Sequence, residues 1–120
     1  MSEQPVLDRS VLAALVDAVD GDRGFVVDLV ETYVVDAEHQ IDELEAAAGA
    51  GDAAATVRPA HTLKSSSATV GAMVVAELAR ESEAAGRDGV LDATRVDALR
   101  VALAAAAAEL RDWMHGGDAS

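Results

Sequence analysis

AHTLKSSSATVGA, residues 60–72, places a histidine, a lysine and several small hydroxyl residues at spacings that share one face of a helix. At 100° per residue, the face centred on His61 carries two cations and otherwise mostly small side chains. Its members are Ala54, Val57, Arg58, His61, Lys64, Ser65, Ala68 and Ala72, whereas Thr56, Leu63, Ser66 and Val70 lie on the far side. The imidazole is therefore predicted to be exposed midway along a helix, with Leu63 turned into the core.

The His61 face suits a transferable phosphoryl group. Its small side chains allow another protein's surface to approach the imidazole closely, and Arg58 and Lys64 lie one helical turn away on either side. Both cations can offset phosphate charge. A lone helical histidine is usually an ordinary surface residue, so only the whole spaced motif indicates a phosphoryl carrier.

This stretch resembles the signature of the histidine-containing phosphotransfer (HPt) family, His-x-Leu-Lys-Gly-Ser-Ser, followed by three variable residues and a glycine. The residues that match in register are His61, Leu63, Lys64, Ser66, Ser67 and Gly71. Ser65 stands where the family has glycine, one turn beyond the histidine. Serine is nearly as small, so close docking is expected to survive, and its hydroxyl can add a hydrogen bond to the ring or to the phosphoryl group.

The resemblance extends to the helix that follows the signature. Leu78 and Glu83 match a Leu-x-x-x-x-Glu pattern of the family at the corresponding offsets from His61. This match implies that Glu83 accepts a hydrogen bond from one imidazole nitrogen and leaves the other free as a nucleophile. The simpler interpretation of Glu83 is an exposed helix carboxylate.

Composition limits the class of protein. A chain of 120 residues has room for one domain with a modest core, and 2% aromatic residues without strand-like alternation favour helices. The net charge of −13 makes nucleic acids and anionic membranes poor partners and favours contacts with proteins. The chain lacks cysteine, which argues against disulfides, thiolate zinc sites and redox chemistry and agrees with a reducing cytoplasm.

Neither a secretory signal nor a membrane span is evident. The N-terminal residues 1–5 lack a basic region with an apolar core after it, and the longest apolar run, residues 101–108, is far too short to cross a bilayer. The chain is therefore expected to be soluble.

Glycines and capping residues divide the chain into five expected helices. The first runs from a cap at Asp8 towards Gly21 with a stripe of Leu7, Val11, Leu15 and Val19. The second runs from about residue 24 to 48 with a stripe of Phe25, Leu29, Tyr33, Ala37, Ile41, Leu44 and Ala48. Asp52 is the expected N-cap of the signature helix, which continues towards Val70, and Pro59 predicts a slight bend within it.

Two more helices follow Gly71. The fourth is expected to turn Val75, Leu78, Ala79 and Ser82 inward, and the fifth, after Asp92, has a seam of Val96, Leu99, Leu103, Ala106, Leu110 and Trp113. We predict an all-α fold, an antiparallel four-helix bundle with an additional short N-terminal helix. It forms a single domain over residues 1–120, with a polar tail from about residue 116.

Other sites are less well supported by the sequence. His39 lies among acidic residues, but ligands from one helix face rarely suffice for a metal site. His115 lies beside Trp113 near a helix end and has no nucleophile motif around it. A Ser–His hydrolase pair has poor geometry, because Ser66 and Ser67 fall largely opposite His61.

The resemblance implies a cytoplasmic phosphorelay protein that accepts a phosphoryl group on His61 from a receiver-domain aspartate and passes it to another receiver. The chain has no Gly-rich nucleotide loop, so we expect a carrier and not a kinase. The expected partners are response-regulator receiver domains and a hybrid sensor kinase. The chain needs no cofactor of its own, because the Mg²⁺ is expected in the partner receiver.

Within this hypothesis Lys64, Ser65 and Glu83 assist His61, and the partner-binding face consists of Ala54, Arg58, Ala68 and Ala72. Two alternatives remain open. One is a non-catalytic helical adaptor that binds receivers or kinases without being phosphorylated. The other is the detached phosphoacceptor module of a chemotaxis-type kinase, which the lack of a kinase segment in this sequence disfavours.

Overall fold

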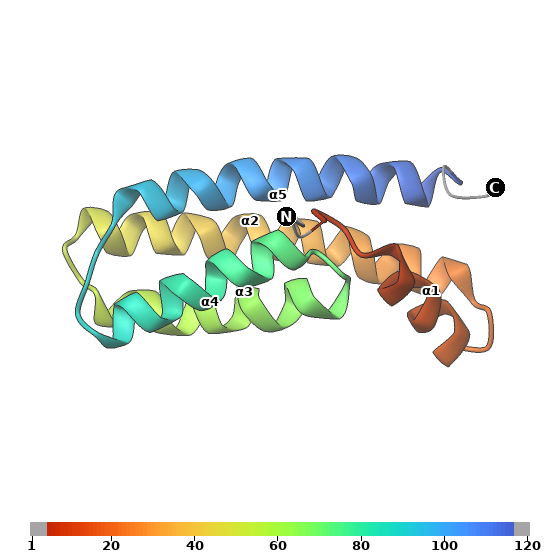
Figure 1. Ribbon diagram of the computed structural model, residues 1–120, viewed down its shortest axis with the longest axis horizontal. Coiled ribbons are helices and arrows are strands. Elements are labelled where there is room, and N and C mark those ends of the chain that lie inside the picture. The colour runs from red at the N-terminus through yellow and green to blue at the C-terminus, as the bar shows by residue number, and fades with distance from the viewer. Residues whose placement is uncertain (1–4, 117–120) are drawn as a thin grey trace.

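The computed structural model describes residues 5–116, and within them every regular element is helical (Figure 1). The predicted all-α bundle with a short N-terminal helix is confirmed. Its elements are α1 (Arg9–Ala18), α2 (Arg23–Gly49), the 3₁₀ turn η1 (Ala54–Thr56), α3 (Val57–Thr69), α4 (Met73–Arg87) and α5 (Ala93–Met114). The predicted polar tail falls largely on residues 117–120, outside the described range.

Two long helices form the frame of the bundle. Figure 1 shows α2 and α5 running side by side along its whole length, with the shorter α3–α4 hairpin packed along part of them. Beyond the turn of that hairpin, α1 packs at the end of the bundle in place of α3 and α4. The backbone N–H of Asp8 donates to the carbonyl of Gly71 at 2.8 Å, and Arg9 forms ion pairs with Glu109 and Asp112 of α5 at 3.3 and 3.1 Å. The N-terminal helix is therefore anchored to the hairpin turn and to α5.

Gly71 is required at that turn for two reasons. Its φ of +84° is a conformation that residues with a Cβ rarely adopt, and a Cβ there would lie 2.6 Å from the carbonyl oxygen of Asp8. The residue thus ends α3 and lets the chain before α1 pass close by. Val70 and Ala72 on either side are buried.

Aspartate side chains begin three of the helices. Asp8, Asp22 and Asp92 each accept a hydrogen bond from a backbone N–H of the first turn, at 3.0–3.1 Å. The cap expected at Asp8 is confirmed, and the helix expected after Asp92 begins there, with Asp92 as its N-cap. The prediction for Asp52 was different, since it was expected to cap the signature helix. Its carboxylate instead accepts a hydrogen bond from the backbone N–H of Ala55, in η1, and α3 starts only at Val57.

The later start of α3 changes the position of Pro59. This proline lies in the first turn of α3, where its missing N–H removes no hydrogen bond of that helix. The premise of the expected bend, a proline inside the helix, is therefore wrong. The buried ring instead packs on the core side.

The core lies between the four bundle helices. Every member of the seam predicted for α5 is buried. The stripe predicted for the start of α2 is wrong: Phe25 is 55% exposed, while Val26 and Val30 are fully buried. Repeated steps of four residues drift by 40° each around a helix, whereas the buried stripe combines steps of three and four, which keeps it on one face. Its members are Val26, Val30, Tyr33, Ala37, Ile41, Leu44 and Ala47.

A similar shift occurs in α1. Its fully buried residue is Leu12, which the expected stripe omits, and Val11, Leu15 and Val19 are only half-buried. In α4 the expected inward residues Val75, Ala79 and Ser82 are buried, and Leu78 packs at the edge of the core. These shifts leave the helix order unchanged.

Candidate functional site

His61 lies on α3 with its side chain 57% exposed, while its neighbours Ala60 and Leu63 are fully buried. The spacing predicted this orientation. The buried pair fixes the rotation of α3 against the bundle, because turning the helix to hide the imidazole would bring Ala60 and Leu63 into water. The ring is therefore accessible to another protein.

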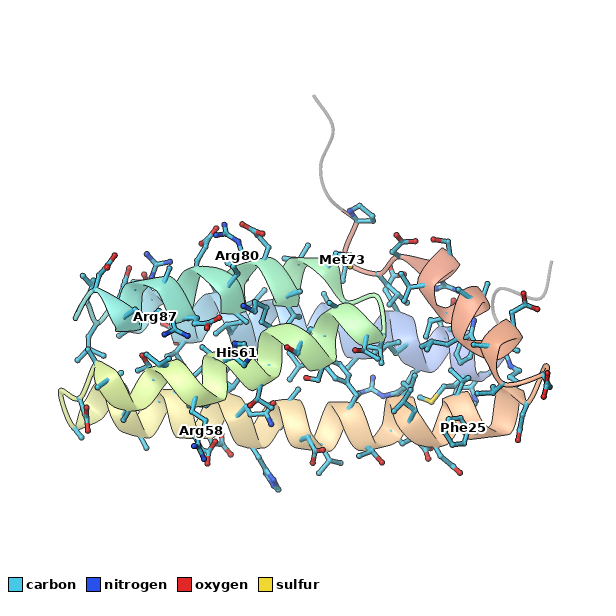
Figure 2. All side chains as sticks on the ribbon, turned by 90° about the horizontal axis from the view of Figure 1, so that it is seen from below. Phe25, Arg58, His61, Met73, Arg80 and Arg87 are labelled. Atoms are coloured by element: carbon cyan, nitrogen blue, oxygen red, sulfur yellow. The ribbon has the colours of Figure 1, made fainter. Side chains whose placement is uncertain are left out.

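Glu83 reaches His61 from α4. Its Oε2 lies 3.0 Å from His61 Nδ1, and its side chain is only 8% exposed. Figure 2 shows His61 on the side of α3 that faces α4. The alternative of an exposed helix carboxylate is wrong, because the hairpin encloses Glu83 between the two helices.

Two cations complete the surroundings of the carboxylate. Lys64 Nζ donates to Glu83 Oε1 at 2.7 Å, and Arg87 Nη2 donates to Oε2 at 2.7 Å. Hydrogen bonds from Lys64 and then Arg87, with a smaller contribution from His61, outweigh burial and lower the pKa of Glu83 to about 2. Glu83 is therefore an anion throughout the physiological range of pH. We refer to Lys64, Glu83 and Arg87 as the Glu83 cluster.

The charge of Glu83 selects one form of the imidazole. A carboxylate can only accept hydrogen bonds, so the neutral ring that faces it carries its proton on Nδ1. The lone pair is then on Nε2, the ring nitrogen that is free of Glu83. The buried anion therefore holds the ring in one orientation, with Nε2 carrying the lone pair that a nucleophile requires.

Arg87 is a residue of the site that was not predicted from the sequence. The signal was present, since Arg87 follows Glu83 by four residues and side chains at this spacing meet on a helix surface. Without knowing that Glu83 was buried beside His61, this pair resembled any other exposed ion pair. Lys64, in contrast, was placed beside His61 by its spacing.

Other residues predicted for this site occupy two different environments. Ser65 and Ala68 are exposed on the His61 face of α3, and Ala54 is exposed in η1. Arg58 is exposed too, but Figure 2 shows it on the side of α3 nearer α2, away from the Glu83 cluster. The structure thus brings Lys64 and Glu83 together around His61 and sets Arg58 apart.

Ala72 does not belong to this face, so its assignment to the partner-binding surface is wrong. It is fully buried and precedes the first residue of α4. The angular extrapolation fails because α3 ends at Thr69 and the chain then turns through the left-handed Gly71. Beyond the end of a helix, 100° per residue no longer describes where side chains point.

The hydroxyl groups of Tyr33 and Ser67 meet on the opposite side of α3. Their oxygens lie 2.7 Å apart, and Tyr33 and Ser67 are 4% and 0% exposed. Burial raises the pKa of Tyr33 to about 12. Ser67 therefore faces the neighbouring helix, as its spacing predicted, and serves packing between α2 and α3.

The remaining histidines lie apart from this site. His39 on α2 and His115 after α5 are exposed. Within residues 5–116 no three histidine, aspartate or glutamate side chains gather closely enough to hold a metal ion. None of the helices in that range combines the length and apolarity that a membrane span requires.

The low pKa of Glu83 predicts a pH-dependent stability. As the pH falls, the unfolded chain takes up this proton near the ordinary value of 4.5, and the folded protein takes it up only near 2. The stabilisation by Glu83 is therefore complete above pH 4.5 and is lost as the pH falls towards 2. Glu83→Gln should flatten the rise in the free energy of unfolding between pH 2 and 4.5, measured by urea denaturation.

Glu77→Gln is the matched control. Glu77 lies on the same helix and pairs with Arg80, but both side chains are well exposed and solvent screens the pair. Its replacement should change the same slope less. An unchanged slope in Glu83→Gln would contradict the pairing of the buried Glu83 with Lys64 and Arg87.

Two comparisons with known proteins point to the same family. The family model of the Hpt domain matches residues 28–113. The crystal structure of histidine-containing phosphotransfer protein B (HptB) from Pseudomonas aeruginosa PAO1 is similar, with a TM-score of 0.84 and 29% sequence identity. That similarity covers 94% of this chain and 97% of the other. No curated protein gives a significant match.

Proposed function

Since the chain belongs to the Hpt domain family and has a histidine phosphotransfer role in a phosphorelay, we propose that His61 is the residue that carries the phosphoryl group. One observation supports this assignment above all others. His61 is an exposed imidazole whose Nδ1 lies 3.0 Å from a buried carboxylate that is ionised at neutral pH. The other two histidines of the chain lack such a partner among the described residues.

The transfer is a displacement at phosphorus. The Nε2 lone pair of His61 attacks the phosphorus of a receiver's aspartyl phosphate, the N–P bond forms, and the P–O bond to the aspartate breaks. The electron pair of that bond stays on the receiver's carboxylate. The Nδ1 proton remains on the ring, where Glu83 stabilises the positive charge that develops as Nε2 is phosphorylated. The reverse step passes the group to a second receiver.

The donor and acceptor in this proposal are response-regulator receiver domains, with a hybrid sensor kinase as an additional partner. The receiver supplies the acidic pocket and the Mg²⁺. On this side of the complex Lys64 offsets phosphoryl charge, and Ser65 offers a small surface with one hydroxyl. The proposal makes this chain a carrier in the cytoplasm, where sensor kinases use ATP.

The test uses the purified chain, a sensor kinase, its receiver and radiolabelled ATP. Label should reach this chain only when the receiver is present, and it should be lost in acid, as expected of a phosphohistidine. A chain that binds the phosphorylated receiver but takes up no label would be the non-catalytic adaptor. Direct labelling by a kinase without a receiver would favour the chemotaxis-type module.

Partner docking on the His61 face predicts the effect of a large side chain at Ala68. Ala68 is exposed one turn beyond Ser65, so Ala68→Trp should leave the bundle stable and obstruct an approaching receiver. We expect the transfer rate from a phosphorylated receiver to fall by about tenfold or more, since misplacing the reacting atoms by about 1 Å already costs two orders of magnitude. Transfer kinetics and a thermal melt measure the two effects.

Potassium phosphoramidate provides the control, because this small donor phosphorylates histidine without a docked protein. Ala68→Trp should react with it at the normal rate. Normal transfer from the receiver to a folded Ala68→Trp protein would mean that docking occurs on another face.

A further inference from the structure

Glu83 poses an electrostatic problem for the reaction proposed above. It is an anion that touches the ring of the phosphoacceptor, whereas the incoming phosphoryl group is itself negatively charged. An unneutralised carboxylate in a largely buried position would repel that group and slow the reaction. Some cation must therefore stay with Glu83 while the phosphoryl group arrives.

Lys64 is poorly suited to remain paired with Glu83 during the transfer. It lies on α3 one turn beyond His61, on the face that we propose for the partner; exposure does not separate the two cations, since the side chain of Lys64 is 33% exposed and that of Arg87 is 62% exposed. Lys64 is also the cation that we propose to bind the phosphoryl oxygens and offset their charge. Its ammonium group has three N–H donors but only one positive charge, so when it also binds phosphoryl oxygens it no longer neutralises Glu83 fully.

Arg87 is placed differently. Its Nη2 lies 2.7 Å from Oε2, the same oxygen that faces His61 Nδ1 at 3.0 Å. Both Arg87 and Glu83 belong to α4, so their contact does not depend on how α3 and its lysine adjust. Figure 2 shows Arg87 on the side of α4 that faces α3, whereas Arg80 points away from α3.

We propose that Arg87 is a positioning residue for phosphoryl transfer. It holds Oε2 of Glu83 on Nδ1 of His61 and neutralises the carboxylate, so that an anionic group can orient the histidine without repelling the phosphoryl group. This role rests on the proposed function of His61. Arg87 acts through Glu83 and does not touch the reacting atoms.

The first experiment measures the rate at which phosphoramidate phosphorylates His61, so that no protein partner is involved. Arg87→Gln should lower the rate by about tenfold, the size expected from losing one close charge partner. Arg87→Lys should recover much of the loss, since it restores the charge. Arg80→Gln, the same change on the same helix in an arginine that pairs with exposed Glu77, should stay within about twofold of the original protein.

A double-variant cycle shows whether Arg87 acts through Glu83. Once Glu83→Gln has removed the carboxylate, nothing remains for Arg87 to neutralise. Adding Arg87→Gln should then change the rate by no more than about twofold. An equal tenfold loss in both backgrounds would overturn the proposal, because it would mean that Arg87 acts independently of Glu83.

The second readout does not depend on phosphorylation. The ¹⁵N NMR shifts of His61 distinguish a proton on Nδ1 from a proton on Nε2. The original protein and Arg80→Gln should show the Nδ1–H form, and Arg87→Gln should show a mixture because Glu83 is no longer held in place. Unchanged shifts and an unchanged rate in Arg87→Gln would overturn the role of Arg87. Failure of the unaltered protein to accept phosphoryl groups on His61 would instead overturn the proposed function.

Discussion

Replacing His61 with glutamine is expected to abolish phosphoryl acceptance from a phosphorylated receiver and to leave the bundle folded. The amide of glutamine has no nucleophilic nitrogen, so the loss should exceed about a thousandfold and fall below detection. The imidazole is 57% exposed, so the change in the free energy of unfolding should stay within about 1 kcal/mol. Acid-labile label and a urea titration measure the two quantities.

His39→Gln is the matched control for this experiment. His39 is an exposed histidine on α2, and its replacement should leave acceptance unchanged. Label that persists in a folded His61→Gln protein would exclude His61 as the acceptor. Loss of label in His39→Gln alone would move the site to α2.

The largest effect on stability is expected from Ser67→Leu. Ser67 is fully buried and its hydroxyl lies 2.7 Å from that of Tyr33. A leucine overpacks the contact between α2 and α3 and leaves the Tyr33 hydroxyl unpaired, which together cost roughly 2–6 kcal/mol. The whole free energy of unfolding of a domain of this size is about 5–15 kcal/mol. The melting temperature of the variant should therefore lie far below that of the original protein.

Two further variants separate the causes. Ser67→Ala removes only the hydroxyl partner and should cost about 1–3 kcal/mol. Ala68→Leu adds a similar side chain at the next, exposed position and should change stability by no more than about 0.5 kcal/mol. Equal melting temperatures for Ser67→Leu and Ala68→Leu would contradict the orientation of α3.

The sequence was sufficient to predict the helix order, because glycines, capping aspartates and apolar periodicity all mark the same boundaries. The α5 seam was predicted correctly over its whole length, since its apolar residues alternate steps of three and four. The buried residues in the first turns of α1 and α2 were not predicted correctly. Each of these turns has two adjacent apolar residues, Val11 and Leu12 in α1 and Phe25 and Val26 in α2. Periodicity alone cannot decide which residue of such a pair is buried.

The candidate site shows a similar limit. Residues on one helix, such as His61 and Lys64, have a fixed angular relation that spacing reveals. The contact between His61 and Glu83 joins two helices, and its prediction required the resemblance to a known family. Arg87 could not be predicted even with that resemblance. Its importance depends on the burial of Glu83, which only the packing of α3 against α4 reveals.

The α3–α4 hairpin also has a consequence for folding kinetics. His61 and Glu83 are only 22 residues apart, and the turn at Gly71 brings their helices together. Closing so short a loop costs little chain entropy, and contacts of low sequence separation form rapidly. The histidine and its orienting carboxylate can therefore meet as soon as the hairpin forms, before the distant ends α1 and α5 have joined through Arg9.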